Sequence, residues 1–340
     1  MSLRGTIQQS VVPTLLFVVL LFSGGAFAAD APPGGGFSIP IDCRPGRDCW
    51  VMNYPDMDPG PGVADPACGV RSYDGHKGTD FAVRDIEAMR RGVSVLAAAA
   101  GTVRRVRDGV ADRLIRNAAD MKVVAGRDCG NGVVVDHGKG WETQYCHMRR
   151  GSLAVRVGEV VQRGQPLGQI GLSGRTEFPH VHLTIRQDGI VRDPLSGRAH
   201  SSGCGAARIS LWRDPLPYRP SALYAAGFAA GPVTGDGVKR DAASSERLTA
   251  AAPALVFWMA AFGVQKDDRL TLSITAPDGR ALIKREIILP RNQAWRMNFA
   301  GKKRGQGRWP SGIYRGEAVL RRGAGAEALV LRRQVSISIE

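Results

Sequence analysis

The sequence has few aromatic residues and a shortage of acidic ones. Phe, Trp and Tyr make up 6% of the 340 residues, and 31 Asp and Glu face 46 Lys and Arg, which leaves a net charge of +15. The positive electrostatic potential that this net charge creates favours anionic partners. There is no nucleic-acid motif, and the arginines are scattered instead of alternating with aromatic residues, so nucleic acid is not an expected partner. An anionic polymer of the cell envelope fits the charge, and so does a plain soluble basic surface.

No segment beyond the N-terminus looks transmembrane, and the N-terminus itself has an apolar run between Val11 and Phe22. Arg4 precedes this run and Ala26-Phe27-Ala28 follows it, which is the pattern of a secretory signal peptide cleaved near Ala28. An uncleaved anchor is the alternative, but the run is short of the roughly 20 residues that a spanning helix needs. We therefore predict a signal peptide at 1–28, a periplasmic or secreted protein, and no stable membrane insertion after cleavage.

Cysteine is scarce, and none of the spacings between the six residues is that of a zinc knuckle. An even number of cysteines in an exported protein suggests disulfides, because the compartment is oxidising. Cys129 and Cys146 bracket a hairpin pattern with arms at 133–136 and 142–146. Cross-strand pairing brings such residues together, so we predict a disulfide between Cys129 and Cys146. The pairing of the other four cysteines stays open.

Composition divides the rest of the chain into four predicted segments. Residues 29–66 are rich in Pro, Gly and Asp and are expected to be loop. Residues 67–200 show short strands separated by glycine, which is typical of compact antiparallel β structure. Residues 201–247, dominated by Gly, Ala, Ser and Pro, suit a linker. Residues 248–340 alternate apolar and polar positions, contain no His or Cys, and predict a small β-sandwich. The expected fold class is therefore all-β.

Histidines and one aspartate carry the chemistry. His180 and His182 lie in a stretch typical of a strand, so their side chains point to the same face. His76 and Asp80 are four residues apart, close enough for one metal ion to contact both, and His147 stands alone between the two motifs. Two imidazoles and one carboxylate, with water in the fourth position, are the ligands of a catalytic zinc site. If these side chains close on one point, the pattern predicts a zinc enzyme with two histidines left over.

Six motifs follow one another between Tyr73 and Pro194. They are 75–82, 95–103, 130–138, 143–148, 157–168 and His180-Val181-His182, with Asp193-Pro194 behind them. A lone His-x-His is a weak signal, but the ordered series resembles the lysostaphin-type metallopeptidases, the LytM or M23 family of peptidoglycan endopeptidases. The resemblance covers roughly a third of the chain. For these residues it implies a compact antiparallel β-sheet of the barrel-sandwich kind.

The resemblance also implies roles for the five side chains. His76, Asp80 and His182 are expected to bind Zn²⁺, and His147 and His180 to be catalytic. Zinc lowers the pKa of its bound water toward ~7 and polarises the scissile carbonyl. The family lacks the His-Glu-x-x-His helix whose Glu serves as base, so one imidazole must take the proton of water and the other can donate one. The sequence does not say which histidine does which.

The activity that the resemblance implies is zinc-dependent hydrolysis of peptide stems or cross-links of peptidoglycan, and a bond between D-Ala and a diamino acid is the leading target. One alternative is a non-enzymatic LytM-like protein that activates a cell-wall amidase or binds the wall. Another is a secreted peptidase for glycine-rich proteins. Residues 175–179 are bulkier than the family pattern, which leaves the substrate open. A further hypothesis is that residues 53–58 cover the zinc and inhibit the enzyme.

Overall fold

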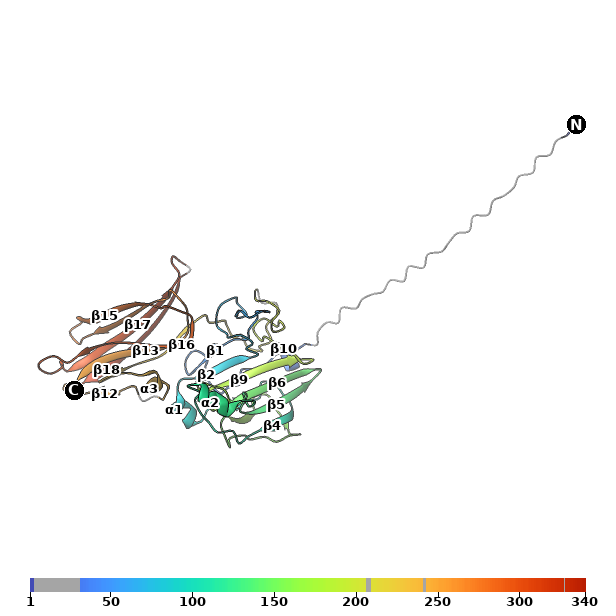
Figure 1. Cartoon of the computed structure of the whole chain (residues 1–340), viewed down its shortest axis with the longest axis horizontal. Coiled ribbons are helices and arrows are strands. Elements are labelled where there is room, and N and C mark those ends of the chain that lie inside the picture. The colour runs from blue at the N-terminus through green and yellow to red at the C-terminus, as the bar shows by residue number, and fades with distance from the viewer. Residues whose placement is uncertain (3–30, 206–208, 241–242, 327) are drawn as a thin grey trace. The chain divides into compact units, whose positions relative to one another are not determined.

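Figure 1 shows the computed structural model of the chain, which describes residues 1–2, 31–205, 209–240, 243–326 and 328–340. The chain divides into the units 1–30 and 31–340. Apart from its first two residues, the predicted signal peptide at 1–28 lies outside the described residues. None of the helices in the described part has the length and hydropathy that a membrane crossing requires.

The part of the chain before residue 200 is built on an eight-stranded antiparallel sheet, which confirms the predicted fold class. Its order is β1 (Cys49–Asn53), β2 (Thr79–Val83), β9 (His180–Gln187), β6 (Trp141–Met148), β5 (Asn131–Gly138), β4 (Gly101–Arg107) and β7 (Val160–Val161), with β10 (Ile190–Arg192) paired to β9. A smaller sheet pairs β3 (Ser94–Leu96) with β8 (Pro166–Gln169). The helical elements here are short: η1 (Pro33–Gly35), α1 (Ile86–Arg91) and α2 (Ala118–Val124).

Side chains alternate between the two faces of the large sheet. Val133 and Val135 of β5 and Tyr145 of β6 are almost completely buried in a core cluster. Val134 lies between the two valines and therefore points to the other face, together with its cross-strand partner Gln144. The alternation thus packs one face of the sheet into the core, while the side chains of the other face point away from this core.

We call this second face the open face. Gln144 pairs with Thr184, and Cys146 pairs with His182. Residues that pair directly across an antiparallel ladder share a face. The register therefore places His182 on the open face, together with Gln144, Cys146 and Thr184.

The predicted loop at 29–66 is corrected by the structure. The sequence Cys-Trp-Val-Met-Asn forms β1, which pairs antiparallel with β2 at the edge of the large sheet. Phe37 and Ile41 are at most 1% exposed and belong to the same core as β5 and β6. The Pro- and Gly-rich composition hid these apolar residues, which make the segment an integral part of the fold.

The predicted disulfide Cys129–Cys146 is confirmed at the end of the β5–β6 hairpin. The other two bridges, whose pairing the sequence left open, are Cys43–Cys49 and Cys68–Cys204. Cys43–Cys49 closes a short turn before β1, with a sequence separation of 6. Cys68–Cys204 has a separation of 136 and joins the segments before β2 and after β10.

Removing Cys68–Cys204 with serine at both positions is expected to lower the free energy of unfolding by about 2–5 kcal/mol, because the bridge closes a long loop in the unfolded chain. Urea unfolding under non-oxidising, non-reducing conditions measures this. The double serine variant of Cys43 and Cys49 is the matched control, since its shorter loop predicts a smaller loss. Equal losses for the two variants would contradict the loop-length argument.

The C-terminal part forms a β-sandwich of two sheets, as predicted. One sheet has the order β11 (Ala222–Ala229), β13 (Ala254–Val264) and β16 (Gln293–Lys303). The other has the order β12 (Arg247–Leu248), β18 (Leu329–Ile339), β17 (Gly312–Arg322), β14 (Arg269–Thr275) and β15 (Ala281–Ile288). Buried Leu, Ile, Phe and Met side chains from both sheets form one core.

The segment 201–247, expected as a linker, differs from that expectation in its second half. It contains β11, the short helix α3 (Gly235–Lys239) and β12, and β11 pairs along its length with β13. The small residues of β11 have a structural reason, because a Cβ on Gly227 would lie 2.3 Å from Ser244 Oγ and 2.9 Å from the Trp258 ring. The glycine at position 227, which contributes to the linker-like composition, is therefore explained by its close contact with Ser244 and Trp258.

Aromatic side chains join the sandwich to the turn that precedes β9. Phe178 is 1% exposed, and its ring packs edge-on against Phe262, with 5.4 Å between the ring centroids. Tyr224 of β11 stacks on Phe262 and also contacts Trp50 of β1. The sandwich therefore supports the backbone that leads into His180.

Candidate metal centre

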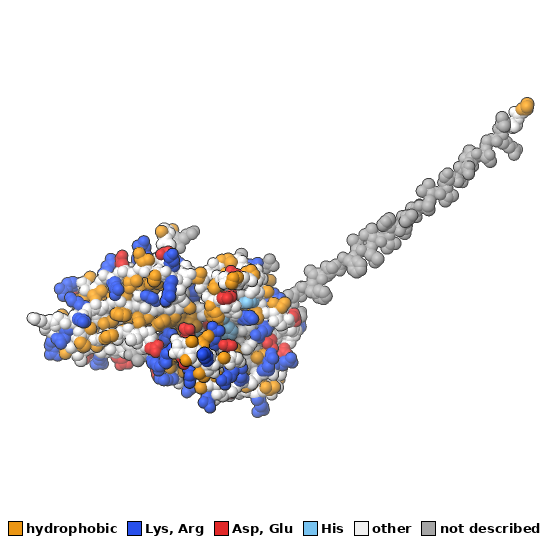
Figure 2. Space-filling model, viewed as in Figure 1, with side chains coloured by type: hydrophobic (Ala, Val, Ile, Leu, Met, Phe, Trp, Pro, Cys, Tyr) orange, Lys and Arg blue, Asp and Glu red, His pale blue; other side chains and the backbone are white. Residues whose placement is uncertain are grey.

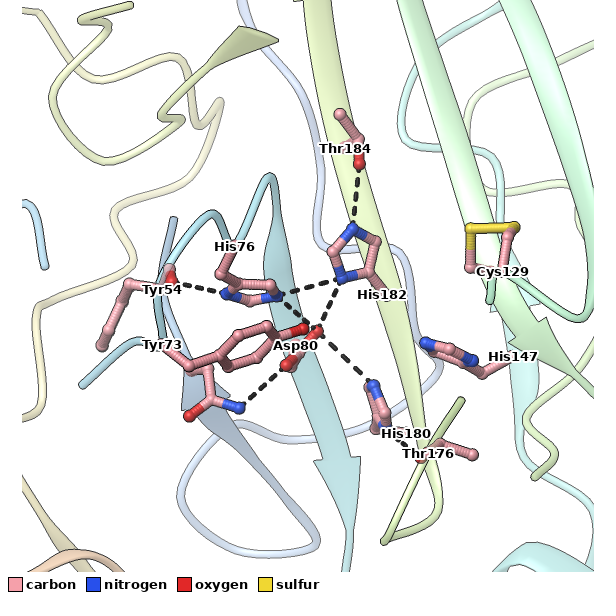
Figure 3. A network of polar contacts seen from close by, with 12 residues as sticks. Tyr54, Tyr73, His76, Asp80, Cys129, His147, Thr176, His180, His182 and Thr184 are labelled. Atoms are coloured by element: carbon pink, nitrogen blue, oxygen red, sulfur yellow. Dashed lines mark hydrogen bonds and ion pairs between the residues drawn. A yellow bond between two sulfur atoms is a disulfide. The ribbon is translucent and has the colours of Figure 1, made fainter. Parts of the chain in front are cut away.

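The five side chains singled out in the sequence lie together on the open face (Figure 3). His180 and His182 begin β9, Asp80 is on β2, and His147 is near the end of β6. Because β9 lies between β2 and β6, the register sets His182 opposite Asp80 on one side and opposite Cys146 on the other. His76 comes from the loop before β2. Strand pairing thus gathers residues that are more than a hundred positions apart.

Three donor atoms converge at this centre. His76 Nε2 lies 3.2 Å from Asp80 Oδ1 and 3.1 Å from His182 Nδ1, and His182 Nδ1 lies 2.9 Å from Asp80 Oδ1. Ligands about 2.0–2.1 Å from a tetrahedral zinc ion are about 3.3 Å from one another. The triangle therefore fits one face of a zinc coordination tetrahedron, and these three residues form a group that can hold a metal ion.

In both His76 and His182, the ring nitrogen that points away from the centre forms a hydrogen bond. This bond orients the other nitrogen of each ring toward the centre. His76 Nδ1 lies 2.7 Å from the carbonyl oxygen of Tyr54, which can only accept, so Nδ1 carries the hydrogen and Nε2 the lone pair. His182 Nε2 lies 2.9 Å from Thr184 Oγ1, which leaves Nδ1 for the centre. Two imidazole lone pairs facing each other at this distance fit a cation between them.

Asp80 is 2% exposed. Burial acts to raise the pKa of its carboxyl, but His76 and His180 outweigh burial and hold this pKa well below its usual range. Its second oxygen, Oδ2, accepts a hydrogen bond of 2.9 Å from Asn53 Nδ2, and Asn53 Oδ1 is buried without a partner. Burial lowers the pKa of His182. A charged carboxylate beside a neutral imidazole is the protonation state that metal binding requires.

His147 and His180 form a second pair beside the donor triangle. Their ring centroids are 4.6 Å apart. His147 Nδ1 donates to Ser173 O at 2.8 Å, and His180 Nδ1 donates to Phe178 O at 2.7 Å. In the neutral form of each ring, Nε2 then carries the lone pair. His180 Nε2 lies 3.5 Å from Asp80 Oδ1.

The two rings differ in their electrostatic surroundings. Burial, together with His180 and His182, holds the pKa of His147 well below its usual value. Burial also acts to lower the pKa of His180, but Asp80 outweighs it and the pKa is raised. His147 further adopts a left-handed backbone with φ of 63°, an uncommon conformation for a residue other than glycine. Its amide donates to Cys129 O, so the disulfide segment holds this unusual backbone in place.

Sequence reasoning missed the residues that support the centre. Tyr73 is 52% exposed and its ring stacks on His76, with 4.3 Å between the centroids. Asn53 and Tyr54 lie in the segment 53–58, which the sequence suggested as a cover over the zinc. Their hydrogen bonds to Asp80 and His76 were not predicted, and neither was the bond between His147 and the Ser173 carbonyl. Thr184 was open to prediction, because it lies two residues after His182 on the same strand face.

The two remaining histidines lie outside the centre. His137 bonds to Ala100 O and Thr143 Oγ1, both at 2.8 Å. His200 bonds to Ser201 Oγ at 2.8 Å and is partly buried. Neither belongs to the metal-binding group.

Residues 74–194 match the sequence profile of Peptidase family M23. Among curated relatives, Peptidoglycan DD-endopeptidase ShyC of Vibrio cholerae is 37% identical over 65 residues, which are 19% of this chain and 14% of that protein. An uncharacterized metalloprotease of Haemophilus influenzae is 26% identical over 130 residues, 38% of this chain and 22% of that protein. This chain therefore spans less than a quarter of the length of these relatives.

The solved structures that resemble the chain include a zinc containing peptidase from Vibrio cholerae, with 24% identity, a TM-score of 0.32 and coverage of 46% of this chain and 39% of that one. The catalytic domain of lysostaphin from Staphylococcus simulans has 21% identity, a TM-score of 0.26 and coverage of 36% and 77%. The sequence match and the antiparallel sheet agree on the same segment. The sequence profile therefore identifies a Peptidase family M23 domain at residues 74–194 of this chain.

Proposed function

We propose that this protein is a zinc-dependent endopeptidase that hydrolyses peptide stems or cross-links of peptidoglycan. His76, Asp80 and His182 hold the zinc ion, and His147 and His180 are catalytic. The observation that carries the proposal is the convergence of three donor atoms with two further imidazoles beside them. The family match and the relatives named as peptidoglycan DD-endopeptidases support the substrate class.

The chain's own groups divide the work around this centre. The chemistry supplied by bound zinc is that of a Lewis acid, which polarises a scissile carbonyl and makes a nearby water more acidic. His147 Nε2 accepts the proton of the attacking water, because its Nδ1 is held as a donor by Ser173 O. His180, oriented by Phe178 O, carries a proton on Nε2 when its ring is cationic, a form that Asp80 favours by raising its pKa. In that form it donates a hydrogen bond to the developing oxyanion or its proton to the leaving amine.

We further propose that the protein acts in the periplasm or outside the cell, where peptidoglycan is accessible. The three disulfides support an oxidising compartment. The signal-peptide pattern at 1–28 supports export.

The proposal is tested with the purified mature protein by measuring its zinc content and digesting isolated sacculi. One zinc ion per chain and new muropeptides in the mass spectrum are expected. Zinc binding without any cleavage, combined with activation of a separate cell-wall amidase, would favour the non-enzymatic alternative. Cleavage of oligoglycine but not of sacculi would favour a peptidase for glycine-rich proteins.

The hypothesis that residues 53–58 cover the zinc needs a point variant. A deletion through residue 66 would remove β1 and the buried Phe37 and Ile41, and therefore an edge strand of the large sheet and part of its core. Asn53 is the residue of this segment that bonds directly to Asp80.

Asn53→Ala is expected to weaken zinc affinity by about 10–100-fold, because Asp80 loses the hydrogen bond that orients its carboxylate. Competition with a chelating dye measures the affinity, and Asn298→Ala in β16 is the control that removes a carboxamide elsewhere. Unchanged zinc affinity with faster release of muropeptides would instead identify Asn53 as a cover over the centre.

A further inference from the structure

A second feature of the open face is a hollow of about 510 Å³ next to the metal centre. Its lining includes Arg104, Arg105 and Arg107 of β4, Val134 of β5 and Gln144 of β6. We call it the arginine hollow. None of its lining residues is acidic.

Strand register connects the arginine hollow to the metal centre. Arg105 pairs with Val134, Val134 pairs with Gln144, and Gln144 pairs with Thr184, whose hydroxyl contacts His182. Paired residues share a face, so this row crosses the sheet on the open face from β4 to β9. The hollow and the metal centre therefore share one face of the sheet, so that a peptide lying across the strands could contact both.

A disulfide and a hydrogen-bonded glutamine lie between the two sites. Cys129 lines the hollow, and its disulfide partner Cys146 stands opposite His182. Gln144 Nε2 lies 3.4 Å from both sulfur atoms, and its Oε1 accepts a hydrogen bond of 2.8 Å from Arg186. These bonds tie the lining of the hollow to β9, the strand that carries His180 and His182.

The charges around the hollow do not cancel. Glu142 is shared by Arg186 at 3.1 Å and Arg105 at 3.5 Å, and Asp136 pairs with Arg104 at 3.4 Å. Arg107 donates its Nε to Gly130 O at 2.6 Å and has no carboxylate within ion-pair distance in the described part of the chain. Four guanidinium groups therefore face two carboxylates, which leaves positive charge for an anionic ligand.

We propose that the arginine hollow is a subsite for a free carboxylate of the substrate peptide, recognised by Arg105 and Arg107. A guanidinium binds a carboxylate through paired N–H donors, which suits this ligand better than a neutral amide. Val134 and Val157, the latter 63% exposed, supply apolar surface for a small side chain next to the carboxylate. This inference rests on the proposed function, since it specifies which peptides the same site takes. Figure 2 shows Lys and Arg side chains distributed over the surface of the folded part of the chain, in keeping with its net positive charge.

The test is calorimetric binding of a synthetic stem tetrapeptide that ends in a free D-Ala carboxylate, compared with the same peptide amidated at its carboxyl groups. The full mature protein loaded with zinc is used at physiological salt. The double variant Arg105→Gln/Arg107→Gln is expected to bind the acidic peptide about tenfold more weakly and the amidated peptide as well as before. Arg91→Gln on α1 is the control, because it removes the same charge from an exposed position outside the hollow.

Three outcomes would overturn the inference: an acidic peptide bound equally by the double variant, equal losses for both peptides, or no preference of the unaltered protein for the acidic form. Digestion of sacculi in parallel separates this inference from the proposed function. Cleavage without carboxylate preference refutes the subsite alone, whereas binding of the acidic peptide without any cleavage refutes the proposed function alone.

Discussion

His182→Ala is expected to abolish both zinc binding and the release of muropeptides. The substitution removes one of three converging donors and leaves His76 Nε2 and Asp80 Oδ1 as an incomplete pair. It also removes the hydrogen bond between His182 Nε2 and Thr184 Oγ1, which orients the ring of His182 on β9. Zinc per chain should fall from one to near zero in the dialysed protein, and cleavage of sacculi should fall to background.

His137→Ala is the matched control for this variant. This substitution also removes an imidazole with two hydrogen bonds. His137 lies at the C-terminal end of β5 and outside the metal-binding group. Its zinc content and activity should equal those of the unaltered protein, once thermal unfolding shows that both variants fold. Full activity of zinc-free His182→Ala would refute the assignment of the metal centre.

His147→Ala is expected to separate catalysis from metal binding. Its ring lies 6.1 Å from that of His182, measured between centroids, so its removal leaves the donor triangle intact. Loss of a group that transfers a proton in the transition state typically costs about 10²–10⁴-fold in rate. Zinc content should therefore stay at one per chain while the rate of muropeptide release falls by that factor.

The companion variant His180→Ala tests the second imidazole in the same way. Its Nε2 lies 3.5 Å from Asp80, so zinc affinity is to be measured beside the rate. A rate loss with unchanged affinity identifies a catalytic group, whereas a loss of both means that His180 supports the metal site. A His147→Ala variant that loses zinc as completely as His182→Ala would contradict the division of roles proposed above.

The position of the C-terminal sandwich bears on these results. Phe178 offers its carbonyl to His180 and buries its ring against Phe262 of the sandwich. The orientation of one proposed catalytic ring thus depends on packing between the two parts of the chain. Variants should therefore be made in the full mature chain.

Local patterns were sufficient for several features of this protein. A period of two on a strand places His180 and His182 on one face, and the hairpin between 133 and 146 brings Cys129 to Cys146. Alternating apolar positions after residue 248 were enough to predict the sandwich. Each of these signals lies within one strand or one hairpin, where geometry follows from spacing along the chain.

Other features were decided only by the tertiary structure. β1 and β11 were hidden by Pro-, Gly- and Ala-rich composition, and each becomes a strand because a neighbouring strand supplies its hydrogen bonds and its core. The arginine hollow likewise exists only because β4, β5 and β6 pair in one register.

The metal centre combines features that the sequence determines with features that only the tertiary structure decides. The residue types of the donors were determined by the sequence, in motifs that predict a metal site. Their orientation was decided by backbone carbonyls, Tyr54 O at a separation of 22 residues from His76 and Ser173 O at 26 from His147. Any residue type supplies a carbonyl, so such partners leave no mark in the sequence, and only the folded chain brings them within hydrogen-bond distance.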